Sequence, residues 1–363
     1  MAAAKRVPRS TNSETEAIAD LGWPDWIDPA ATSRLREAIL GGRIGHSYLL
    51  SGPKGVGKAA AARAFAQALC CTSEERKDRS DPCGRCRACR NVLRGVHPDV
   101  ETFSLDTQEM LADKPGRGSN LTIETVRRLR SSGALFPVES DRRILIIDDA
   151  ETLLEPAQQA LLKTLEEPPQ GVTLMLLTDE PEILLETVRS RCQEVALRPI
   201  PQVMVAQALQ RRGVAESLAI EVAMLSRGCP GWAIAAAADK KLLQARRDER
   251  DSAVRWIASP RYERLVTAFT LGDQFGKRRA EVVGILQAAI QLLRDEMIVA
   301  AQAAGEAGEN EPQSVGGTPP AVLFSRAIGA TLQCLSDLNS NVRPRLALEA
   351  MVVAWPNSEM RDR

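Results

Sequence analysis

The sequence predicts an α/β domain followed by all-α domains, and three observations support this fold class. Over the first 199 residues, short β-rich runs alternate with segments of helical spacing, the pattern of a parallel sheet covered by helices on both faces. From Pro199 onward the strand pattern ends and amphipathic helical segments follow. The length of 363 residues fits two or three domains.

Five short runs predict the strands of the sheet, at residues 47–51, 99–105, 143–149, 172–178 and 193–197. Beyond Pro199, helical spacing is clearest at residues 202–212, 216–226 and 281–302. The expected organisation is a flexible polar tail, the α/β domain, a small helical domain, a final helical domain and a second tail, with boundaries at 1–20, 21–199, 200–258, 259–356 and 357–363. A segment rich in Gly, Pro and Glu, residues 303–320, predicts a surface loop in the last domain.

Composition excludes several classes of protein. The 47 basic and 47 acidic side chains give a net charge of zero, so no overall field attracts the chain to nucleic acid or anionic lipid. No apolar run is long enough to span a membrane, and the first twenty residues lack the apolar centre of a secretory signal. We therefore expect a cytoplasmic protein that does not associate with membranes.

A glycine-rich segment after the first strand predicts a phosphate-binding loop. The pattern G-x-x-x-x-G-K follows a strand and opens an Ala-rich helix, the context in which backbone N–H groups surround a phosphate. Lys58 would reach the outer phosphates, so ATP or ADP is a possible ligand. The alternative is an ordinary glycine-rich turn. The loop consists of Gly52, Pro53, Lys54, Gly55, Val56, Gly57 and Lys58.

Two features of this candidate site depart from a hydrolysing ATPase. Ala59 follows Lys58, where a phosphate loop normally offers Ser or Thr to Mg²⁺, and a methyl group cannot coordinate a metal. The strand RILII ends in Asp148, the expected metal-side acid, and in Asp149, which is shorter than the Glu that polarises water in many ATPases. Glu151 lies two residues farther on, and the carboxylates at the strand end could instead cap the next turn. Bound Mg²⁺ is therefore doubtful and ATP hydrolysis should be weak or absent.

Four cysteines predict a structural zinc site. Cys83, Cys86 and Cys89 are spaced as C-x-x-C-x-x-C, and Cys71 lies upstream, which suits a closed tetrahedral Zn²⁺ site. Cys70 is an alternative fourth ligand, and a disulfide is less suited to a reducing cytoplasm. Both histidines, His46 and His97, fall outside the spacing of the cluster. Arginines around the cluster could contact a partner or a phosphate backbone, or form a solvated surface.

The motifs, in this order, resemble the subunits of the bacterial replication clamp loader of DNA polymerase III, a branch of the AAA+ ATPases, and the details favour its delta prime family. The resemblance spans most of the chain. Its motifs are GRIGHSYLLSGPKGVGK (42–58), the Cys module with HPDV (97–100), IIDDAE (146–151), ALLKTLEEPP (160–169) and TDEPEILLETVRSRC (178–192).

The resemblance implies an AAA+ RecA-like domain with a zinc module, a helical lid domain and a helical collar domain. It implies that Arg191, in the Ser-Arg-Cys motif, is an arginine finger that acts in trans on ATP bound by a neighbouring subunit. It also places Thr178 at the sensor position near the γ-phosphate. A surface arginine at a helix end is the alternative for Arg191.

The departures from the family's motor subunits distinguish the subunit types. Gamma and tau would have Thr, Glu and a lid-helix Arg where this chain has Ala59, Asp149 and Gly231. The resemblance therefore implies a largely non-hydrolysing scaffold in a hetero-pentamer with gamma/tau and delta subunits, which reaches the sliding clamp and primed DNA through the complex. Two alternatives stay open: a hydrolysing motor subunit, and a metal-stabilised nucleic-acid-binding module with a vestigial phosphate loop.

Overall fold

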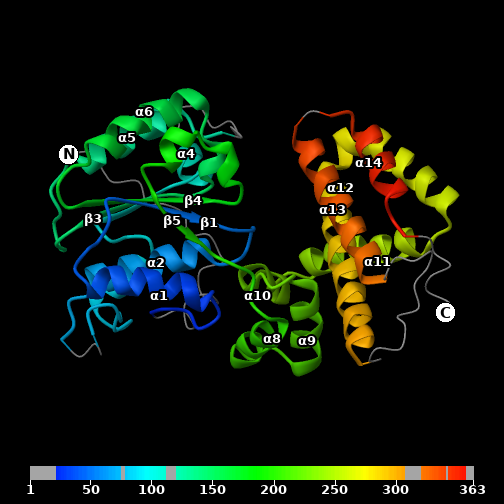
Figure 1. Ribbon diagram of the computed structural model, residues 1–363. Helices are drawn as coiled ribbons and strands as arrows, with labels where there is room; N and C mark the ends of the chain where they lie inside the picture. The colour runs from blue at the N-terminus through cyan, green and yellow to red at the C-terminus, as the bar shows by residue number, and fades with distance from the viewer. Residues whose placement is uncertain (1–21, 75–77, 112–119, 307–319, 341, 357–363) are drawn as a thin grey trace. The chain divides into compact units, whose positions relative to one another are not determined.

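The computed structural model describes residues 22–74, 78–111, 120–306, 320–340 and 342–356. The expected tails, and most of the expected loop at 303–320, lie outside the described residues. The chain forms two compact units, residues 1–237 and 238–363, whose helices and strands are shown in Figure 1. Each unit has its own core.

The first unit contains one sheet of five strands in the order β2-β3-β4-β1-β5. All neighbouring strands are parallel, which confirms the AAA+ RecA-like sheet expected from the sequence. β1, β3 and β4 are buried at every position, as strands covered on both faces must be. The strands are β1 (Ser47–Ser51), β2 (Val100–Phe103), β3 (Arg143–Ile147), β4 (Val172–Thr178) and β5 (Gln193–Ala196).

Helices cover both faces of this sheet (Figure 1). α1 (Pro29–Leu40) and α2 (Lys58–Cys70) lie on one face, and α4 (Leu105–Leu111), α5 (Ile123–Gly133) and α6 (Glu155–Glu166) lie on the other. The alanines of α2 let its backbone approach the sheet closely, and Ala61, Ala64 and Phe65 are at most 1% exposed. The side chains of α5 and α6 form a core with β3 and β4, to which Leu129, Leu145, Leu161 and Leu176 belong.

Short helices complete the first unit. α3 (Arg87–Leu93) packs against α2, and α7 (Glu186–Arg189) packs against α6. Two 3-10 turns, η1 (Ala150–Thr152) and η2 (Pro181–Ile183), follow β3 and β4. After β5 the chain continues into α8 (Gln202–Arg211), α9 (Glu216–Leu225) and α10 (Pro230–Ala238).

The second unit is helical. It consists of α11 (Lys240–Ala258), α12 (Arg261–Glu306), α13 (Pro320–Asn339) and α14 (Pro344–Val353), and α12 contains one non-helical residue, Arg278. In its core the rings of Trp256 and Trp355 lie 5.1 Å apart between centroids. Arg264, 3% exposed, donates from its guanidinium to the carbonyl oxygens of Ile257 and Pro356, so it links the last turn of α11 to the segment after α14.

One expected boundary does not coincide with the division between the units. The sequence assigns residues 240–258 to the small helical domain, but α11 contributes Ala253, Trp256 and Ile257 to the core of the second unit, and the division falls between residues 237 and 238. Ser259 and Pro260 do end a helix, but the apolar face of that helix packs into the core of the second unit.

Of the helices in the described ranges, none combines the length and apolarity needed to cross a membrane.

Candidate nucleotide-binding loop, metal centre and exposed arginine

The phosphate loop lies between β1 and α2, at the edge of the sheet where the parallel strands end. Gly52, Gly55 and Gly57 have φ angles of 145°, 79° and 110°, values that residues with a Cβ rarely adopt. Gly57 is the N-cap of α2, so the loop has the geometry that places backbone N–H groups around an anion at a helix N-terminus. Pro53 and Lys54 are exposed and Val56 is buried.

Within this loop, Lys58 is held by the protein itself. Its side chain is 9% exposed, and Nζ donates to the carbonyl oxygen of Gly52 at 2.8 Å and forms an ion pair with Asp179. The ammonium group therefore already has acceptors in the place where phosphate oxygens would supply them. A bound nucleotide would have to compete with these contacts.

The N-terminus of α10 closes over the same loop. The backbone N–H groups of Gly231 and Trp232 both donate to the carbonyl oxygen of Gly55, at 2.7 and 3.3 Å. A Cβ on Gly231 would lie 2.8 Å from that oxygen, closer than side chains approach in folded proteins. The close contact therefore requires glycine at position 231.

Two acids follow β3 beside the loop. Burial raises the pKa of Asp148, while the N–H of Asp149 and the charge of Lys58 lower it in part. The pKa of Asp149 is also raised, by burial and by the charge of Asp148. Asp149 has a φ of 54°, which is uncommon for a residue other than glycine. Crowded carboxylates would attract a cation, and Lys58 already supplies one positive charge among them.

The end of β4 completes this edge of the sheet. Thr178 is fully buried, its carbonyl oxygen accepts from the N–H of Gly52 at 3.2 Å, and its hydroxyl accepts from the N–H of Glu180 at 3.1 Å. The structure thus brings together the loop, Asp148, Asp149 and Thr178, which the sequence placed at one site. Ala59, the second residue of α2, is half-buried and offers no ligand atom.

The cysteine cluster forms a compact tetrad. The Sγ atoms of Cys71, Cys83, Cys86 and Cys89 all lie within 4.8 Å of one another, and those of Cys71 and Cys86 are 4.0 Å apart. A tetrahedron with zinc–sulfur bonds of about 2.3 Å has sulfur–sulfur edges of about 3.8 Å. The four thiols therefore fit a zinc ion, which would cross-link the end of α2 to the start of α3.

Backbone N–H groups support negative charge on these sulfurs. The N–H groups of Cys83, Cys86 and Cys89 donate to Sγ of Cys71, Cys83 and Cys86 respectively, at 3.3 to 3.4 Å. Burial would raise the pKa of Cys86, but donors that include the N–H of Cys89 outweigh it and lower this pKa to about 6. Burial raises the pKa of Cys71 and Cys89. A thiolate at Cys86 is thus available to a metal at neutral pH.

Cys70 lies outside the tetrad. It is 2% exposed, and burial raises the pKa of its thiol to about 12, although a hydrogen bond with Ser140 lowers it in part. The geometry therefore favours Cys71 as the fourth ligand, the choice that the sequence left open.

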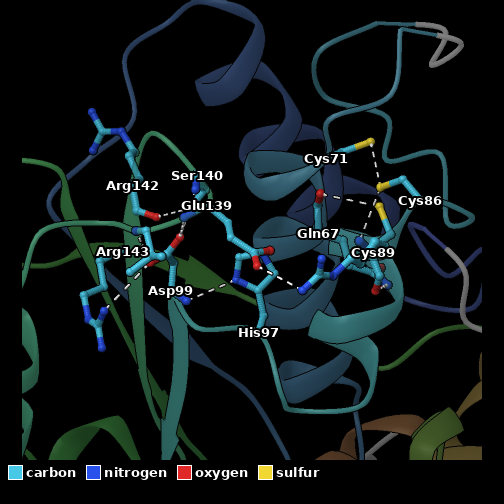
Figure 2. A network of polar contacts seen from close by, with 12 residues as sticks. Gln67, Cys71, Cys86, Cys89, His97, Asp99, Glu139, Ser140, Arg142 and Arg143 are labelled. Atoms are coloured by element: carbon cyan, nitrogen blue, oxygen red, sulfur yellow. Dashed lines mark hydrogen bonds and ion pairs between the residues drawn. The ribbon is translucent and has the colours of Figure 1, made fainter.

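A buried polar network lies beside this module (Figure 2). The carboxylate of Asp99, fully buried, accepts from the N–H groups of Val138, Glu139 and Ser140 at 2.7 to 2.9 Å. His97 Nδ1 accepts from the N–H of Asp99 at 3.1 Å, and burial lowers the pKa of His97. These contacts fix the loop that precedes β3, so His97 has a structural place in the fold.

Arg191 lies just beyond α7 at the surface. Its side chain is 37% exposed, and its guanidinium donates to the Thr187 carbonyl oxygen at 3.0 Å and pairs with Glu166 at 2.8 Å. Its own carbonyl oxygen accepts from the hydroxyl of Ser47 at 2.6 Å. Hydrogen bonds and an ion pair therefore hold both the backbone of Arg191 and its guanidinium in place.

Comparison with known proteins finds a family match within the first unit. Residues 27–201 match the family model described as DNA polymerase III, delta subunit. The match covers 175 of the 363 residues, just under half of the chain. The expected resemblance to the delta prime subunits of DNA polymerase III is confirmed by relatives of that name.

The chain is similar to both delta prime and gamma/tau subunits. It is 38% identical over 164 residues to the delta prime subunit of Pseudomonas aeruginosa, covering 45% of this chain and 46% of that protein. It is 33% identical over 215 residues to the Escherichia coli delta prime subunit, covering 59% and 60%. Against the gamma/tau subunit of Mycobacterium tuberculosis H37Rv the identity is 32% over 187 residues, covering 50% and 30%. The chain thus matches at most 60% of the length of these relatives.

Among solved structures, the chain is similar to a gamma subunit-related protein of Thermotoga maritima. The TM-score is 0.42 at 17% identity, covering 92% of this chain and all of that chain.

Several residues at these sites are not apparent from motif patterns. Asp179, the ion-pair partner of Lys58, and Glu166, the partner of Arg191, lie inside the quoted motifs but were given no role. The contact of Gly231 with Gly55 joins residues far apart in the sequence. Two acidic residues at the end of a helix, in LEEPP, are a signal that could have directed attention to Glu166.

Proposed function

We propose that this chain is a delta prime-type clamp-loader subunit of DNA polymerase III that does not hydrolyse ATP appreciably. Its role is to present Arg191 in trans to ATP bound by a neighbouring subunit. The closed phosphate loop carries this proposal, because Gly231 and Trp232 donate to Gly55 where a motor subunit needs space and an arginine.

The loop retains the backbone for an anion but lacks the groups for phosphoryl transfer. Ala59 gives Mg²⁺ no hydroxyl ligand, and Asp149 has a shorter side chain than a water-polarising Glu. Lys58 is neutralised by Asp179. ATP or ADP held by Gly52–Ala59, with Asp148, Asp149 and Thr178 beside it, would be a structural ligand of this subunit.

Arg191 has the placement that an arginine finger requires. A guanidinium stabilises the charge that develops on a transferred phosphoryl group, provided that it is fixed in position beforehand. Arg191 is part exposed, is anchored through its backbone by Ser47, and has N–H donors beyond those used by Glu166 and Thr187.

The four cysteines, Cys71, Cys83, Cys86 and Cys89, would hold a structural Zn²⁺. A bound zinc ion in a closed four-sulfur site stabilises a fold and leaves no position for a substrate. Here it would fix α3 against α2.

As a delta prime-type subunit, the chain would assemble with gamma/tau and delta subunits in a hetero-pentamer. It would act on the sliding clamp and primed DNA through that complex, in the cytoplasm. Residues 200–237 would form the lid domain, and residues 238–356, which include α11, would form the collar.

Replacing Arg191 with Ala in the assembled complex tests the function. We expect the adjacent site to hydrolyse ATP about 100-fold more slowly, visible as the loss of one phase in single-turnover hydrolysis. Arg189→Ala is the matched control, because Arg189 is an exposed arginine at the end of α7, two residues before Arg191. Unchanged hydrolysis in the Arg191→Ala complex, with normal complex mass, would refute the role.

A motor subunit of the gamma/tau type is the second candidate, because gamma/tau proteins are among the relatives. It requires substantial ATP hydrolysis by this chain's own loop. Measuring turnover by the isolated chain, with Lys58→Ala as the blank, decides between the two.

A further inference from the structure

The two helices that supply partners for Arg191, α6 and α7, are fixed relative to each other. α6 and α7 share a core that contains Leu161, Leu165 and Val188. Gln158, a buried residue of α6, also accepts through its side-chain oxygen from the N–H of Leu185, the N-cap of α7, at 2.8 Å. The end of α6 therefore has a defined position relative to the end of α7.

Glu166 lies at the last residue of α6 and contacts Arg191 directly. Its Oε1 lies 2.8 Å from a terminal nitrogen of the guanidinium, and the other terminal nitrogen donates to the Thr187 carbonyl oxygen at 3.0 Å. These two acceptors, from two different helices, fix the plane of the guanidinium. Arginine has five N–H donors, so donors remain for a ligand from another subunit.

The charge pattern of α6 is unusual for a helix end. The carboxyl end of a helix carries partial negative charge, which disfavours acidic side chains by about 0.3–1 kcal/mol. Yet Glu166 and Glu167 both stand there, immediately before Pro168 and Pro169. A residue that opposes local stability in this way points to a role outside the helix, and Arg191 is the cation that Glu166 contacts.

We propose that Glu166 is a positioning residue for Arg191. It orients the guanidinium toward the neighbouring subunit before ATP arrives, so that no reorganisation is needed during phosphoryl transfer. This inference rests on the proposed function, because it assigns Glu166 a part in the trans-acting role of Arg191. Ser47 fixes the backbone of Arg191, and Glu166 fixes its charged end.

Substitution of Glu166 in the assembled complex tests the inference. We expect Glu166→Ala to lower kcat at the adjacent site between about 10-fold and 100-fold, with KM for ATP and complex mass unchanged. Glu166→Gln keeps an oxygen acceptor and should lose less. Glu167→Ala is the matched control, because it removes an equal charge one residue away, from an exposed side chain.

A double-mutant comparison shows whether Glu166 acts through Arg191. On an Arg191→Ala background, Glu166→Ala should cause no further loss of kcat. Equal kcat in wild type and Glu166→Ala, a rise in kcat, or additive losses would each overturn the inference. If Arg191→Ala itself has no effect, the proposed function fails; if only Glu166→Ala has none, the failure is confined to Glu166.

Discussion

At the scale of single residues, the ion pair between Lys58 and Asp179 occupies the ammonium group that a nucleotide phosphate would contact in the phosphate loop. Lys58 is nearly buried, so its charge is poorly screened and a carboxylate beside it forms a strong competitor for phosphate. Asp179 also adds negative charge where nucleotide phosphates would lie, near Asp148 and Asp149. Both effects would weaken the binding of a nucleotide in this loop.

Asp179→Asn should therefore tighten binding of ATP and ADP. We expect about a ten-fold lower Kd, which corresponds to about 1.4 kcal/mol, because the substitution frees Lys58 and removes a like charge. Isothermal titration calorimetry measures the change. Glu182→Gln, at an exposed acid just beyond β4, serves as the control. Equal or weaker binding by Asp179→Asn would show that the pair does not limit nucleotide binding.

Asp99 is the residue on which the loop before β3 depends. Burial alone would raise its pKa, but the N–H groups of Val138, Glu139 and Ser140 and the Ser140 hydroxyl outweigh it, and the pKa is lowered. Asn at this position would turn an NH₂ group toward those donors. We expect Asp99→Asn to cost about 3 kcal/mol in free energy of unfolding, measured by chemical denaturation with Asp141→Asn as a surface control.

The lowered pKa of Asp99 also gives a pH dependence of known sign. A carboxyl whose pKa is lower in the folded state stabilises the fold above its unfolded pKa of about 3.9, and this stabilisation is lost as the pH falls through the folded pKa. The stability difference between wild type and Asp99→Asn should thus be full at pH 6 and shrink below about pH 4. A constant difference across that range would contradict the assignment.

At the scale of elements, the cysteine tetrad joins α2 to α3. α3 has only seven residues, too few to be stable alone, so the cross-link should decide whether it stays folded. Adjacent Cys70 and Cys71 provide a test in which position is the main variable.

Cys71→Ser should greatly reduce the zinc content of the purified chain, and Cys70→Ala should leave one zinc per chain. Of these two adjacent cysteines, Cys71 places its sulfur in the tetrad, and Cys70 lies instead near Ser140. Elemental analysis after dialysis measures the metal. Loss of zinc from Cys70→Ala, with full zinc in Cys71→Ser, would reverse the ligand assignment.

The strands could be predicted from sequence because local patterns determine them. Buried parallel strands require continuous apolar runs, and RILII and VTLMLLT are such runs, which form β3 and β4 and are buried at every position. The boundary near α11 could not be predicted in this way. Trp256 belongs to the second core because its ring packs against that of Trp355, and a contact between residues 99 positions apart leaves no mark on the local sequence pattern.

The candidate sites also contain residues that local sequence patterns predict and residues that only contacts between distant segments bring together. Motif spacing was sufficient to place Gly52–Lys58, Asp148 and three of the cysteines, Cys83, Cys86 and Cys89, since each motif supplies its own geometry. The choice of Cys71 over Cys70 needed the fold. The partners of Lys58, Arg191 and Gly55, by contrast, come from other elements, and only the folded chain brings them together.

At the scale of the whole molecule, the chain is proposed to separate two tasks that a motor subunit combines. Its own phosphate loop is closed by Gly231, while Arg191 is held at the surface by Glu166 and Ser47. Such a subunit would leave ATP hydrolysis to the site of a neighbouring subunit and would contribute the guanidinium of Arg191 to that site.

ATP turnover by the assembled complex, with Lys58→Ala or Arg191→Ala in this subunit alone, is the most direct measurement of that separation. Lys58→Ala should leave turnover unchanged, because in the proposed role this loop does not hydrolyse ATP, and Arg191→Ala should slow the adjacent site by about 100-fold. The opposite pattern, a loss with Lys58→Ala and none with Arg191→Ala, would identify a working motor subunit and contradict the proposed role.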